Sequence, residues 1–272
     1  MKTFGLIGEK LSHSLSPEIH NVIFQKLGIK ATYNLFEVEN NNIAEVGEAI
    51  RVLNIKGVNI TIPYKEEVIN SVEELSKEAE KIGAINTIIN CEGVLKGYNT
   101  DYYGFGRMLN RFSVSLQNKK VVILGTGGAA KAVAQYVSDS KPRDVVLIAR
   151  NKEKAKRTFK KYDVFDYKDL KNIVGDIIVN TTPVGMYPNM GESPVGTEII
   201  KKYNTAVDII FNPIETEFLR LARENGLKTI DGLYMLVGQA VKAEEIWLDT
   251  EISNAVEEEI YLKIRPLLEE KL

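Results

Sequence analysis

The sequence predicts an α/β protein of two units, an N-terminal α/β domain followed by a Rossmann-type domain. Three observations lead to this prediction. The chain has 272 residues, of which 44% are hydrophobic, which is enough for one large or two medium domains. Short apolar runs alternate with amphipathic segments along most of it. A glycine-rich turn follows one apolar run about two-fifths of the way along the chain, so a substantial unit must precede it.

The N-terminal unit is predicted from apolar runs, amphipathic spacing and one turn signal. Its expected strands are 3–7, 33–38 and 58–62, and its expected helices are 17–27, 43–53 and 65–82. Residues 87–90 and 94–98 are expected to form a hairpin that turns at Glu92-Gly93. A helix over 102–112 then leads towards the second unit.

The second unit begins with the stretch VVILGTGGAAKAVAQYV, residues 121–137. Gly125, Gly127 and Ala130 fit the pattern G-x-G-x-x-G/A between a strand and a helix. The first glycine permits a tight turn, the second lets the backbone approach a pyrophosphate, and the helix N-terminus faces the phosphates. With the following strand Asp144–Ala149 this makes a βαβ unit, which favours dinucleotide binding over a simple turn.

The rest of the chain continues the same alternation. The expected strands are 177–180, 206–210 and 228–230. Residues 183–196 contain three Pro and three Gly and are expected to form a loop. After Asp231-Gly232 the pattern is helical to the end of the sequence.

The end of the second Rossmann strand predicts which dinucleotide binds. An NAD site usually places Asp or Glu there, to accept hydrogen bonds from the ribose 2′-hydroxyl. This chain has Arg150 and Asn151 instead. NADP is therefore favoured, because a guanidinium can grip a 2′-phosphate through paired N–H donors. The next basic residues fit the solvated face of a helix, and of these only Lys154 is expected to join Arg150 at the cofactor.

Composition excludes several classes of protein. The net charge is −2 and no basic stripe is interleaved with aromatic residues, so no nucleic-acid partner is expected. The single cysteine, Cys91, excludes an intrachain disulfide and suggests a reducing compartment. Two histidines, His13 and His20, and no CxxC leave no recognisable metal site. Because no apolar run suits a signal peptide or a membrane span, we expect a cytoplasmic protein that does not bind a membrane.

The stretch SHSLSPEIHN, residues 12–21, is unusually polar. Ser16 followed by Pro17 is typical of a helix N-cap and first helical position, with Glu18 in the first turn. That interpretation leaves Ser14 unexplained. Hydroxyls grouped at a helix N-terminus also suit a substrate carboxylate, and from the residues alone the two interpretations are about equal.

In NITIPYKEEV, residues 59–68, the polar Asn59 and Thr61 alternate with apolar neighbours on the expected strand. Lys65 would open the helix 65–82, where a lysine opposes the helix dipole. An ordinary surface lysine fits this position too. The unfavourable setting favours the neutral amine and hence acid–base chemistry.

The stretches GAINTIIN and GYNTDYYGF place Asn86-Thr87 and Asn99-Thr100-Asp101 at the two ends of the expected hairpin. Asp101 by itself fits a cap of the helix that follows. The repeated Asn-Thr pair is harder to explain as turn chemistry. Amide and hydroxyl groups clustered in this way suit a polyhydroxylated substrate.

These stretches carry a family resemblance. The motifs S-x-S-P-x-I-H-N, N-x-T-x-P-x-K, G-A-x-N-T, G-x-N-T-D, G-x-G-G-A-x-x-A and G-x-x-M-L-x-x-Q occur in this order and cover nearly the whole chain. The sequence thereby resembles the shikimate dehydrogenases, which reversibly reduce 3-dehydroshikimate to shikimate with NADPH on the pathway to chorismate and aromatic amino acids. The resemblance implies a discontinuous substrate domain, 1–101 with 233–272, and an NADP-binding domain, 102–232.

Carried over position by position, the resemblance implies that Lys65 is the catalytic acid–base and that Asp101 is its partner. The residues implied for the substrate are Ser14 and Ser16 at its carboxylate, and Thr61, Asn86, Asp101 and Gln239 at its ring hydroxyls. The residues implied for the cofactor are Gly125, Thr126, Gly127, Gly128, Ala129, Arg150, Asn151, Lys154 and Gly232. Two positions depart from the family: Ala149-Arg150-Asn151 replaces the frequent Asn-Arg-Thr, and Phe211 replaces a frequent Tyr.

Other functions stay open at this point. The nearest alternative is a quinate/shikimate dehydrogenase that accepts NAD. A more distant one is a non-catalytic dinucleotide sensor, which predicts that the polar residues Lys65, Asn86, Asp101 and Gln239 are lost, yet all four are present. We expect a monomer or a homodimer whose partner is the small-molecule substrate.

Overall fold

The computed structural model describes residues 1–12 and 14–269, so His13 lies outside the described residues. The chain forms two compact units. The first comprises Met1–Gly104 and Val237–Ile264, and the second comprises Phe105–Leu236 and the described chain from Arg265. Each unit contains its own six-stranded sheet, which confirms the α/β prediction.

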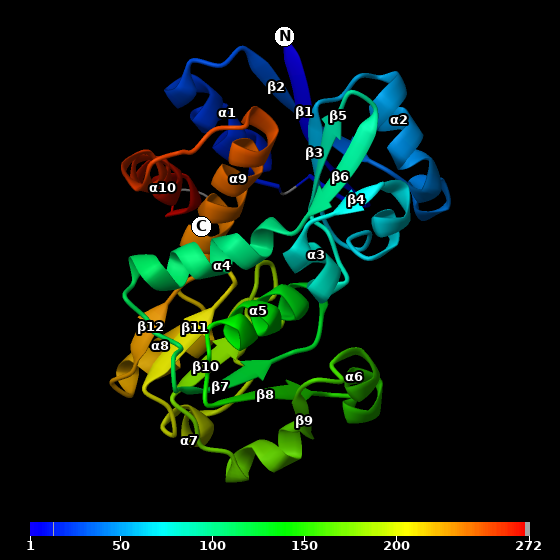
Figure 1. Cartoon of the computed structure of the whole chain (residues 1–272). Helices are drawn as coiled ribbons and strands as arrows, with labels where there is room; N and C mark the ends of the chain where they lie inside the picture. The colour runs from blue at the N-terminus through cyan, green and yellow to red at the C-terminus, as the bar shows by residue number, and fades with distance from the viewer. Residues whose placement is uncertain (13, 270–272) are drawn as a thin grey trace. The chain divides into compact units, whose positions relative to one another are not determined.

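The sheet of the first unit has the strand order β2-β1-β3-β5-β6-β4 (Figure 1). Its strands are β1 (Lys2–Gly8), β2 (Ala31–Glu37), β3 (Gly57–Ile60), β4 (Glu74–Leu75), β5 (Thr87–Cys91) and β6 (Val94–Tyr98). β1 pairs in parallel with β2 and β3, whereas β5 is antiparallel to β3 and β6. The hairpin prediction is confirmed, and its turn residues Glu92 and Gly93 have the positive φ angles, 53° and 95°, that tight hairpin turns favour.

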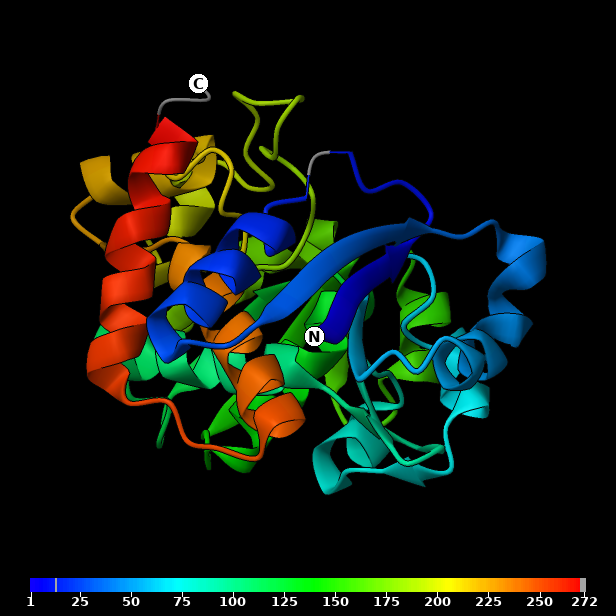
Figure 2. The same ribbon diagram turned by 90° about the horizontal axis from the view of Figure 1, so that it is seen from above.

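Helices cover both faces of this sheet. Helix α1 (Ser16–Leu27) and residues 237–248 of α9 (Leu233–Leu248) lie on one side, and α2 (Val46–Val52) lies on the other (Figure 1). Both views place α1 alongside β2 (Figures 1 and 2). Since side chains alternate along a strand and both faces are covered, the polar Asn59 of β3 is as buried as its apolar neighbours.

The predicted helix over 65–82 is wrong. The chain forms a turn around Lys65, then the 3₁₀ helix η2 (Glu67–Ser71), then β4, and only then α3 (Lys77–Ile82). Two polar side chains favour this course. Glu73 accepts a hydrogen bond from the Leu95 N–H of β6 (2.7 Å), and the Ser76 hydroxyl accepts one from the third residue of α3 and so caps that helix.

Smaller differences concern helix beginnings. The predicted helix 43–53 begins as the 3₁₀ helix η1 (Asn40–Glu45) and continues as α2. The predicted helix 102–112 begins two residues earlier, as α4 (Thr100–Arg111). Neither shift changes the order of the elements along the chain.

The sheet of the second unit is entirely parallel, with the order β12-β11-β10-β7-β8-β9. Its strands are β7 (Lys120–Leu124), β8 (Asp144–Ala149), β9 (Asp163–Asp166), β10 (Ile177–Asn180), β11 (Thr205–Asp208) and β12 (Lys228–Ile230). Counted within the unit, this is the order 3-2-1-4-5-6 of a Rossmann fold, as predicted. Strand β9 was not predicted, because the sequence DVFD is short and mostly polar at its ends.

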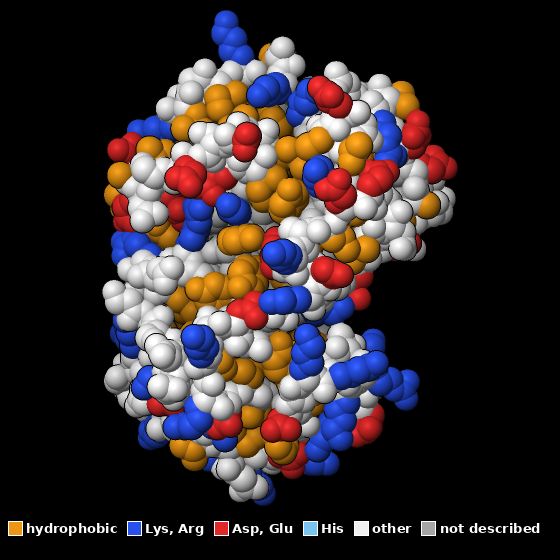
Figure 3. Space-filling view, in the orientation of Figure 1, with side chains coloured by type: hydrophobic (Ala, Val, Ile, Leu, Met, Phe, Trp, Pro, Cys, Tyr) orange, Lys and Arg blue, Asp and Glu red, His pale blue; other side chains and the backbone are white. Residues whose placement is uncertain are grey.

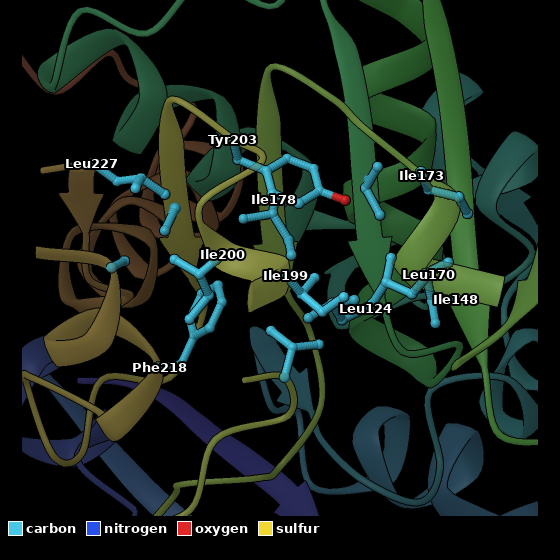
Figure 4. Close-up of a cluster of buried hydrophobic side chains, with 14 of the residues drawn as sticks. Leu124, Ile148, Leu170, Ile173, Ile178, Ile199, Ile200, Tyr203, Phe218 and Leu227 are labelled. Carbon is cyan, nitrogen blue, oxygen red and sulfur yellow. The ribbon is translucent and has the colours of Figure 1, made fainter. Parts of the chain in front are cut away.

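The helices of this unit are α5 (Gly128–Asp139), α6 (Lys152–Thr158), α7 (Thr197–Ile200) and α8 (Glu217–Glu224), with the 3₁₀ helix η3 (Tyr167–Asn172). Figure 4 shows the apolar core on one face of the sheet. There Leu124 of β7 and Ile178 of β10 pack with Phe218 of α8, and all three are fully buried. The predicted loop 183–196 contains no helix or strand.

The chain ends in two long helices, α9 and α10 (Asn254–Glu269), as its pattern predicts. No helix within residues 1–12 and 14–269 has both the length and the hydrophobicity needed to cross a bilayer. The same described residues contain no group of three or more His, Cys, Asp or Glu side chains arranged to hold a metal ion.

Candidate active site

Lys65 and Asp101 form a partly buried ion pair in the first unit. Lys65 Nζ donates to Asp101 Oδ2 over 2.6 Å, and the two side chains are 15% and 12% exposed. The turn that carries Lys65 is held by a hydrogen bond from the Ile85 N–H to the Lys65 carbonyl oxygen (2.8 Å). Since desolvation offsets most of the attraction within such a pair, it is a weak stabiliser and a better indication of a functional site.

Two sequence-based arguments about this pair need correction. Lys65 does not open an α-helix, so opposition to a helix dipole is not what sets it apart. Asp101 does not cap α4, because the helix already begins at Thr100 and the carboxylate is engaged by Lys65 and Asn86. The reason to assign function to both residues is therefore their mutual contact.

Asn86 holds the second oxygen of Asp101. Its Nδ2 donates to Asp101 Oδ1 over 2.9 Å. Its own oxygen accepts from the Thr100 N–H (2.6 Å) and from the hydroxyls of Thr87 and Thr100, both at 3.1 Å. Asn86 is 3% exposed and both threonines are fully buried. The Asn-Thr stretches from opposite ends of the hairpin thus meet in one network.

The part of the network behind Asn86 was missed by sequence reasoning. Asn59 Nδ2 donates to Thr87 Oγ1 (3.0 Å) and to the Asn86 carbonyl oxygen (3.3 Å). The Tyr33 hydroxyl donates to Asn59 Oδ1 (2.8 Å), and both residues are buried. The signal for Asn59 was present, since it is polar between two apolar strand residues. Tyr33 offers none, because tyrosine is common in any strand.

The two serines lie at the start of α1. Ser16 is its first residue, and Leu15 occupies the N-cap position without a side-chain hydrogen bond, so the predicted Ser16 cap is wrong. The Ser14 hydroxyl accepts from the Ser16 N–H (3.2 Å). Both serines and Thr61, which follows β3, are partly exposed. The fold therefore explains these hydroxyls only in part and leaves them accessible.

Gln239 of α9 reaches the same network from the late motif. Thr100 Oγ1 lies 3.5 Å from Gln239 Oε1, a long hydrogen bond that competes with the one to Asn86 for the single hydroxyl proton. Four residues predicted from four different motifs, Lys65, Asn86, Asp101 and Gln239, are thus joined directly or through Thr100 within the first unit.

In the glycine loop of the second unit, one glycine is required by the fold and two are not. Gly125 has φ 104°, and a Cβ there would lie 2.8 Å from Thr181 Oγ1, so the fold itself requires it. Gly127 caps α5 and Gly128 begins it, and a Cβ on either would meet no described atom within 4 Å. The fold does not require these two glycines, whereas a pyrophosphate on the helix N-terminus would. Thr126 and Ala129 are partly exposed on the same turn.

Basic side chains gather around α6. Arg150 follows β8 directly and is exposed, as are Asn151 and Lys154. Asn151 Oδ1 accepts from the Lys154 N–H (3.0 Å) and so caps α6. Burial raises the pKa of Tyr167, and the nearby charge of Arg150 acts against this rise. Figure 3 shows the Lys and Arg side chains over α6 as a blue area, which suits a phosphate.

Gly232 precedes α9 and is explained by packing. A Cβ there would lie 2.1 Å from the Ile209 carbonyl oxygen, so the backbone passes too close for any other residue. Backbone packing alone therefore requires a glycine at position 232, which the resemblance assigns to the cofactor site.

A second buried polar cluster lies where β10 and β11 end. The fully buried Asp208 accepts from Asn180 Nδ2 (3.1 and 3.2 Å), the Ile210 N–H (3.0 Å) and Thr216 Oγ1 (2.7 Å). Burial raises the pKa of Asp208 to about 7, although these hydrogen bonds act against the rise. The cluster fixes both ends of the loop that carries Phe211.

This cluster predicts how stability depends on pH. Folded Asp208 keeps its proton up to about pH 7, whereas an unfolded aspartate loses it near about pH 3.9. Its contribution is therefore complete below about pH 4 and is lost as the pH rises through about 7, a change on the order of 4 kcal/mol. We expect the free energy of unfolding to fall over this range in the wild type, and this part of the fall to be missing in Asp208→Asn.

Urea unfolding followed by circular dichroism at several pH values measures this difference. Asp144→Asn is the matched control, because Asp144 is an exposed carboxylate of the same unit (53% exposed). Equal pH slopes for the wild type and Asp208→Asn would contradict the prediction. Asp231 is a partly buried carboxyl of the same unit, and burial raises its pKa as well, so its own contribution to the pH slope remains in both proteins.

Comparisons with known families agree with this arrangement. The family model described as "Shikimate dehydrogenase substrate binding domain" matches residues 6–88, and the one described as "Shikimate / quinate 5-dehydrogenase" matches residues 108–187. A curated relative, the shikimate dehydrogenase (NADP(+)) of Clostridium perfringens strain 13, is 50% identical over 268 residues. The match covers 97% of this chain and 99% of that relative.

Solved structures give the same result. A chorismate mutase/shikimate 5-dehydrogenase fusion protein from Clostridium acetobutylicum matches with a TM-score of 0.97 and 46% identity over 99% of both chains. The shikimate 5-dehydrogenase of Thermus thermophilus, solved with NADP(H) and shikimate, matches with a TM-score of 0.87 and 30% identity over 97% of this chain and 99% of that one. The resemblance read from the motifs is confirmed, and the chain belongs to the shikimate dehydrogenase family.

Proposed function

We propose that this protein catalyses the reversible NADPH-dependent reduction of 3-dehydroshikimate to shikimate, a step on the way to chorismate. The observation that carries the proposal is the Lys65–Asp101 pair, held by Asn86 in the unit that matches the substrate-binding family model. The curated relative at 50% identity is named for the same activity and cofactor.

We propose that the second unit binds NADP, which fits the donor set there. Gly127 and Gly128 leave an open backbone at the start of α5, and Gly125, Thr126 and Ala129 complete the turn. Arg150, with Asn151 and Lys154, supplies positive charge and donors for the 2′-phosphate. Bound NADPH supplies a hydride to the ketone carbon of the substrate, which is the redox part of the reaction.

The proton transfer that accompanies the reduction is carried out by side chains of this protein. As the ketone carbon is reduced, negative charge grows on its oxygen, and the Lys65 ammonium donates a proton there to complete the alcohol. Asp101 stabilises the ammonium before the transfer and keeps Nζ in one position, because Asn86 fixes its other oxygen. The partly exposed Lys65 then regains a proton from solvent. In the reverse direction the neutral amine accepts the hydroxyl proton.

The remaining roles concern substrate orientation. Ser14 and Ser16 bind the carboxylate through hydroxyls at the start of α1, where the helix N–H groups also favour an anion. Thr61, Asn86, Asp101 and Gln239 bind the ring hydroxyls. We assign the substrate to residues 1–101 with 233–272 and the cofactor to residues 102–232, with Gly232 at the end of the latter.

Location and assembly complete the proposal. The single Cys91 favours a reducing compartment, and we propose the cytoplasm. We propose a monomer or a homodimer, which size-exclusion chromatography with light scattering distinguishes.

A spectrophotometric assay that pairs shikimate or quinate with NADP or NAD tests the proposed function. We expect shikimate with NADP to have the highest kcat/KM, because Arg150 stands where an NAD site usually has an acid. The assay includes NAD because a solved shikimate 5-dehydrogenase from Listeria monocytogenes, 32% identical to this chain, is a complex with shikimate and NAD. A clear preference for quinate or for NAD would instead identify the alternative enzyme.

A further inference from the structure

His20 of α1 and Glu244 of α9 form a buried pair that takes no direct part in the candidate active site. His20 Nδ1 lies 2.5 Å from Glu244 Oε1, and both side chains are fully buried. Their other polar atoms, His20 Nε2 and Glu244 Oε2, have no hydrogen-bond partner among the described residues. Such a pair contributes little to stability, because desolvation offsets the attraction between its members, and its best-attested use is to fix how two elements align.

The His20 ring is fixed by its neighbours, and so is the helix that carries Glu244. His20 stacks on Tyr33 of β2 with a centroid distance of 4.0 Å and an interplanar angle of 9°. One turn beyond Glu244, Trp247 Nε1 donates to the carbonyl oxygen of Ile88 in β5 over 2.9 Å. The sheet therefore holds α9 through Trp247, and the buried pair holds α1 to α9.

Apart from His20, the buried residues of α1 are apolar: Ile19, Val22, Ile23 and Phe24. Apolar packing is non-directional, so by itself it leaves a helix some freedom to slide along its neighbours. A contact between two polar atoms is made at one position only. The His20–Glu244 pair therefore sets the position of α1 along α9.

α1 and the part of α9 in the first unit run in the same direction along the sheet. α1 connects the parallel strands β1 and β2, so it runs opposite to both. In α9, Gln239 lies by Thr100, just beyond the end of β6, whereas Trp247 lies against Gly57, the first residue of β3. Since β3 and β6 are both antiparallel to β5, and β3 is parallel to β1, α9 also runs opposite to β1.

Ser16 and Gln239 consequently lie on the same side of the buried pair. Ser16 is about one helical turn before His20 in α1, and Gln239 is about one and a half turns before Glu244 in α9. Because the backbone hydrogen bonds keep each helix rigid over this length, a shift of α1 against α9 at the pair changes the distance between Ser16 and Gln239.

We propose that His20 and Glu244 are positioning residues that set the spacing between Ser16 and Gln239. The inference rests on the proposed function, in which Ser16 binds the carboxylate of the substrate and Gln239 binds a ring hydroxyl. The six-membered ring of shikimate fixes the distance between these two groups, so both contacts are made only when α1 and α9 are correctly aligned. A misaligned α1 loses one contact, which weakens substrate binding and leaves the Lys65–Asp101 pair unchanged.

Replacing both members of the pair, His20→Phe with Glu244→Met, tests the inference. The two apolar side chains fill similar space and keep a flat ring against Tyr33, so we expect the protein to fold. We expect the KM for shikimate to rise about 2- to 10-fold, the loss of one neutral hydrogen bond to the substrate. We expect kcat and the KM for NADP to change by less than about 2-fold, because neither Lys65 nor the second unit is altered. Steady-state kinetics measures all three constants.

Two single variants serve as controls. Glu244→Gln keeps the contact, because an amide can accept from His20 Nδ1 or donate to it, and we expect a KM for shikimate within about 2-fold of the wild type. Lys26→Met removes another polar contact of α1, the ion pair with Glu259 of α10, whose side chains are 41% and 55% exposed. Because this ion pair is exposed and lies in the last turn of α1, away from Ser16, we expect wild-type KM values for shikimate and NADP.

A shikimate analogue with a hydroxymethyl group in place of the carboxylate separates positioning from a general loss of active enzyme. The analogue lacks the anionic group that Ser16 binds, so its binding depends less on the spacing between Ser16 and Gln239. We expect the double variant to lower kcat/KM for the analogue by a smaller factor than for shikimate. A general loss of active enzyme would lower both by the same factor.

The inference is overturned by a folded double variant with the wild-type KM for shikimate, by equal factors for shikimate and the analogue, or by a Glu244→Gln variant whose KM for shikimate is as high as that of the double variant. A double variant that circular dichroism shows to be unfolded would also overturn it, since the pair would then be a requirement of the fold. An inactive wild type with every pairing of substrate and cofactor would refute the proposed function. Any of the other outcomes with an active wild type refutes only the role of the pair.

Discussion

Replacing Lys65 by methionine is expected to lower kcat by about 10²–10⁴-fold while the KM for shikimate changes little. Methionine keeps an apolar stem of similar reach, so packing in the turn after β3 is retained. It lacks the ammonium that contacts Asp101 Oδ2 over 2.6 Å, so no proton is donated to the developing oxyanion. Steady-state kinetics with NADP and shikimate measures both constants.

Lys96→Met is the matched control for this variant. Lys96 lies in the same unit and forms an ion pair with Glu74 (2.8 Å), but it takes no part in the hydrogen bonds around Asp101. We expect its kcat to equal that of the wild type. If Lys65→Met has the wild-type kcat and circular dichroism shows an intact fold, the proposed mechanism is wrong. Lys65 would then be an ordinary ion-paired lysine.

Arg150→Ala is expected to raise the KM for NADP by about 10- to 150-fold and to leave the KM for NAD nearly unchanged. The expected size corresponds to one charge-assisted hydrogen bond, about 1.5–3 kcal/mol, between the guanidinium and the 2′-phosphate. NAD has no 2′-phosphate, so it loses nothing when the guanidinium is removed. Kinetics with each dinucleotide at saturating shikimate measures the difference.

Arg157→Ala controls for the general loss of positive charge around α6. Arg157 is exposed in the last turn of that helix, away from the end of β8. We expect it to change both KM values by less than about 2-fold, since single exposed charges contribute little through solvent. Equal losses for NADP and NAD in Arg150→Ala would mean that Arg150 does not contact the 2′-phosphate.

Elements that depend on local signals were predictable. The hairpin turns at Glu92-Gly93, where the glycine adopts a positive φ angle without steric cost between two short apolar runs. The βαβ unit around Gly125 has its own strand, turn and helix signals within about thirty residues. Both predictions needed no knowledge of distant parts of the chain, and both are confirmed.

The predicted single helix over 65–82 is wrong, although the segment has the apolar spacing of a helix. The chain there forms η2, the short strand β4 and α3 instead. Glu73 accepts a hydrogen bond from Leu95 of β6, which lies outside the segment and could not be weighed from it. Ser76 caps α3 through Ala79, which is a local helix-start signal that the prediction passed over. The error mattered for the site. Lys65 was singled out for a helix dipole that does not exist, whereas its partner Asp101, thirty-six residues further along the chain, is what sets it apart.

By itself, the sequence determined the fold class, the order of most elements, the family and the polar residues that its motifs name. Only the tertiary structure decided which of those residues meet, and it added two more: Tyr33, which lies in no motif, and Asn59, which begins a motif but had been given no role. The physical reason is that periodicity and turn chemistry act over a few residues. A hydrogen bond such as that from Tyr33 to Asn59 exists only because β1 aligns β2 and β3 on either side of it.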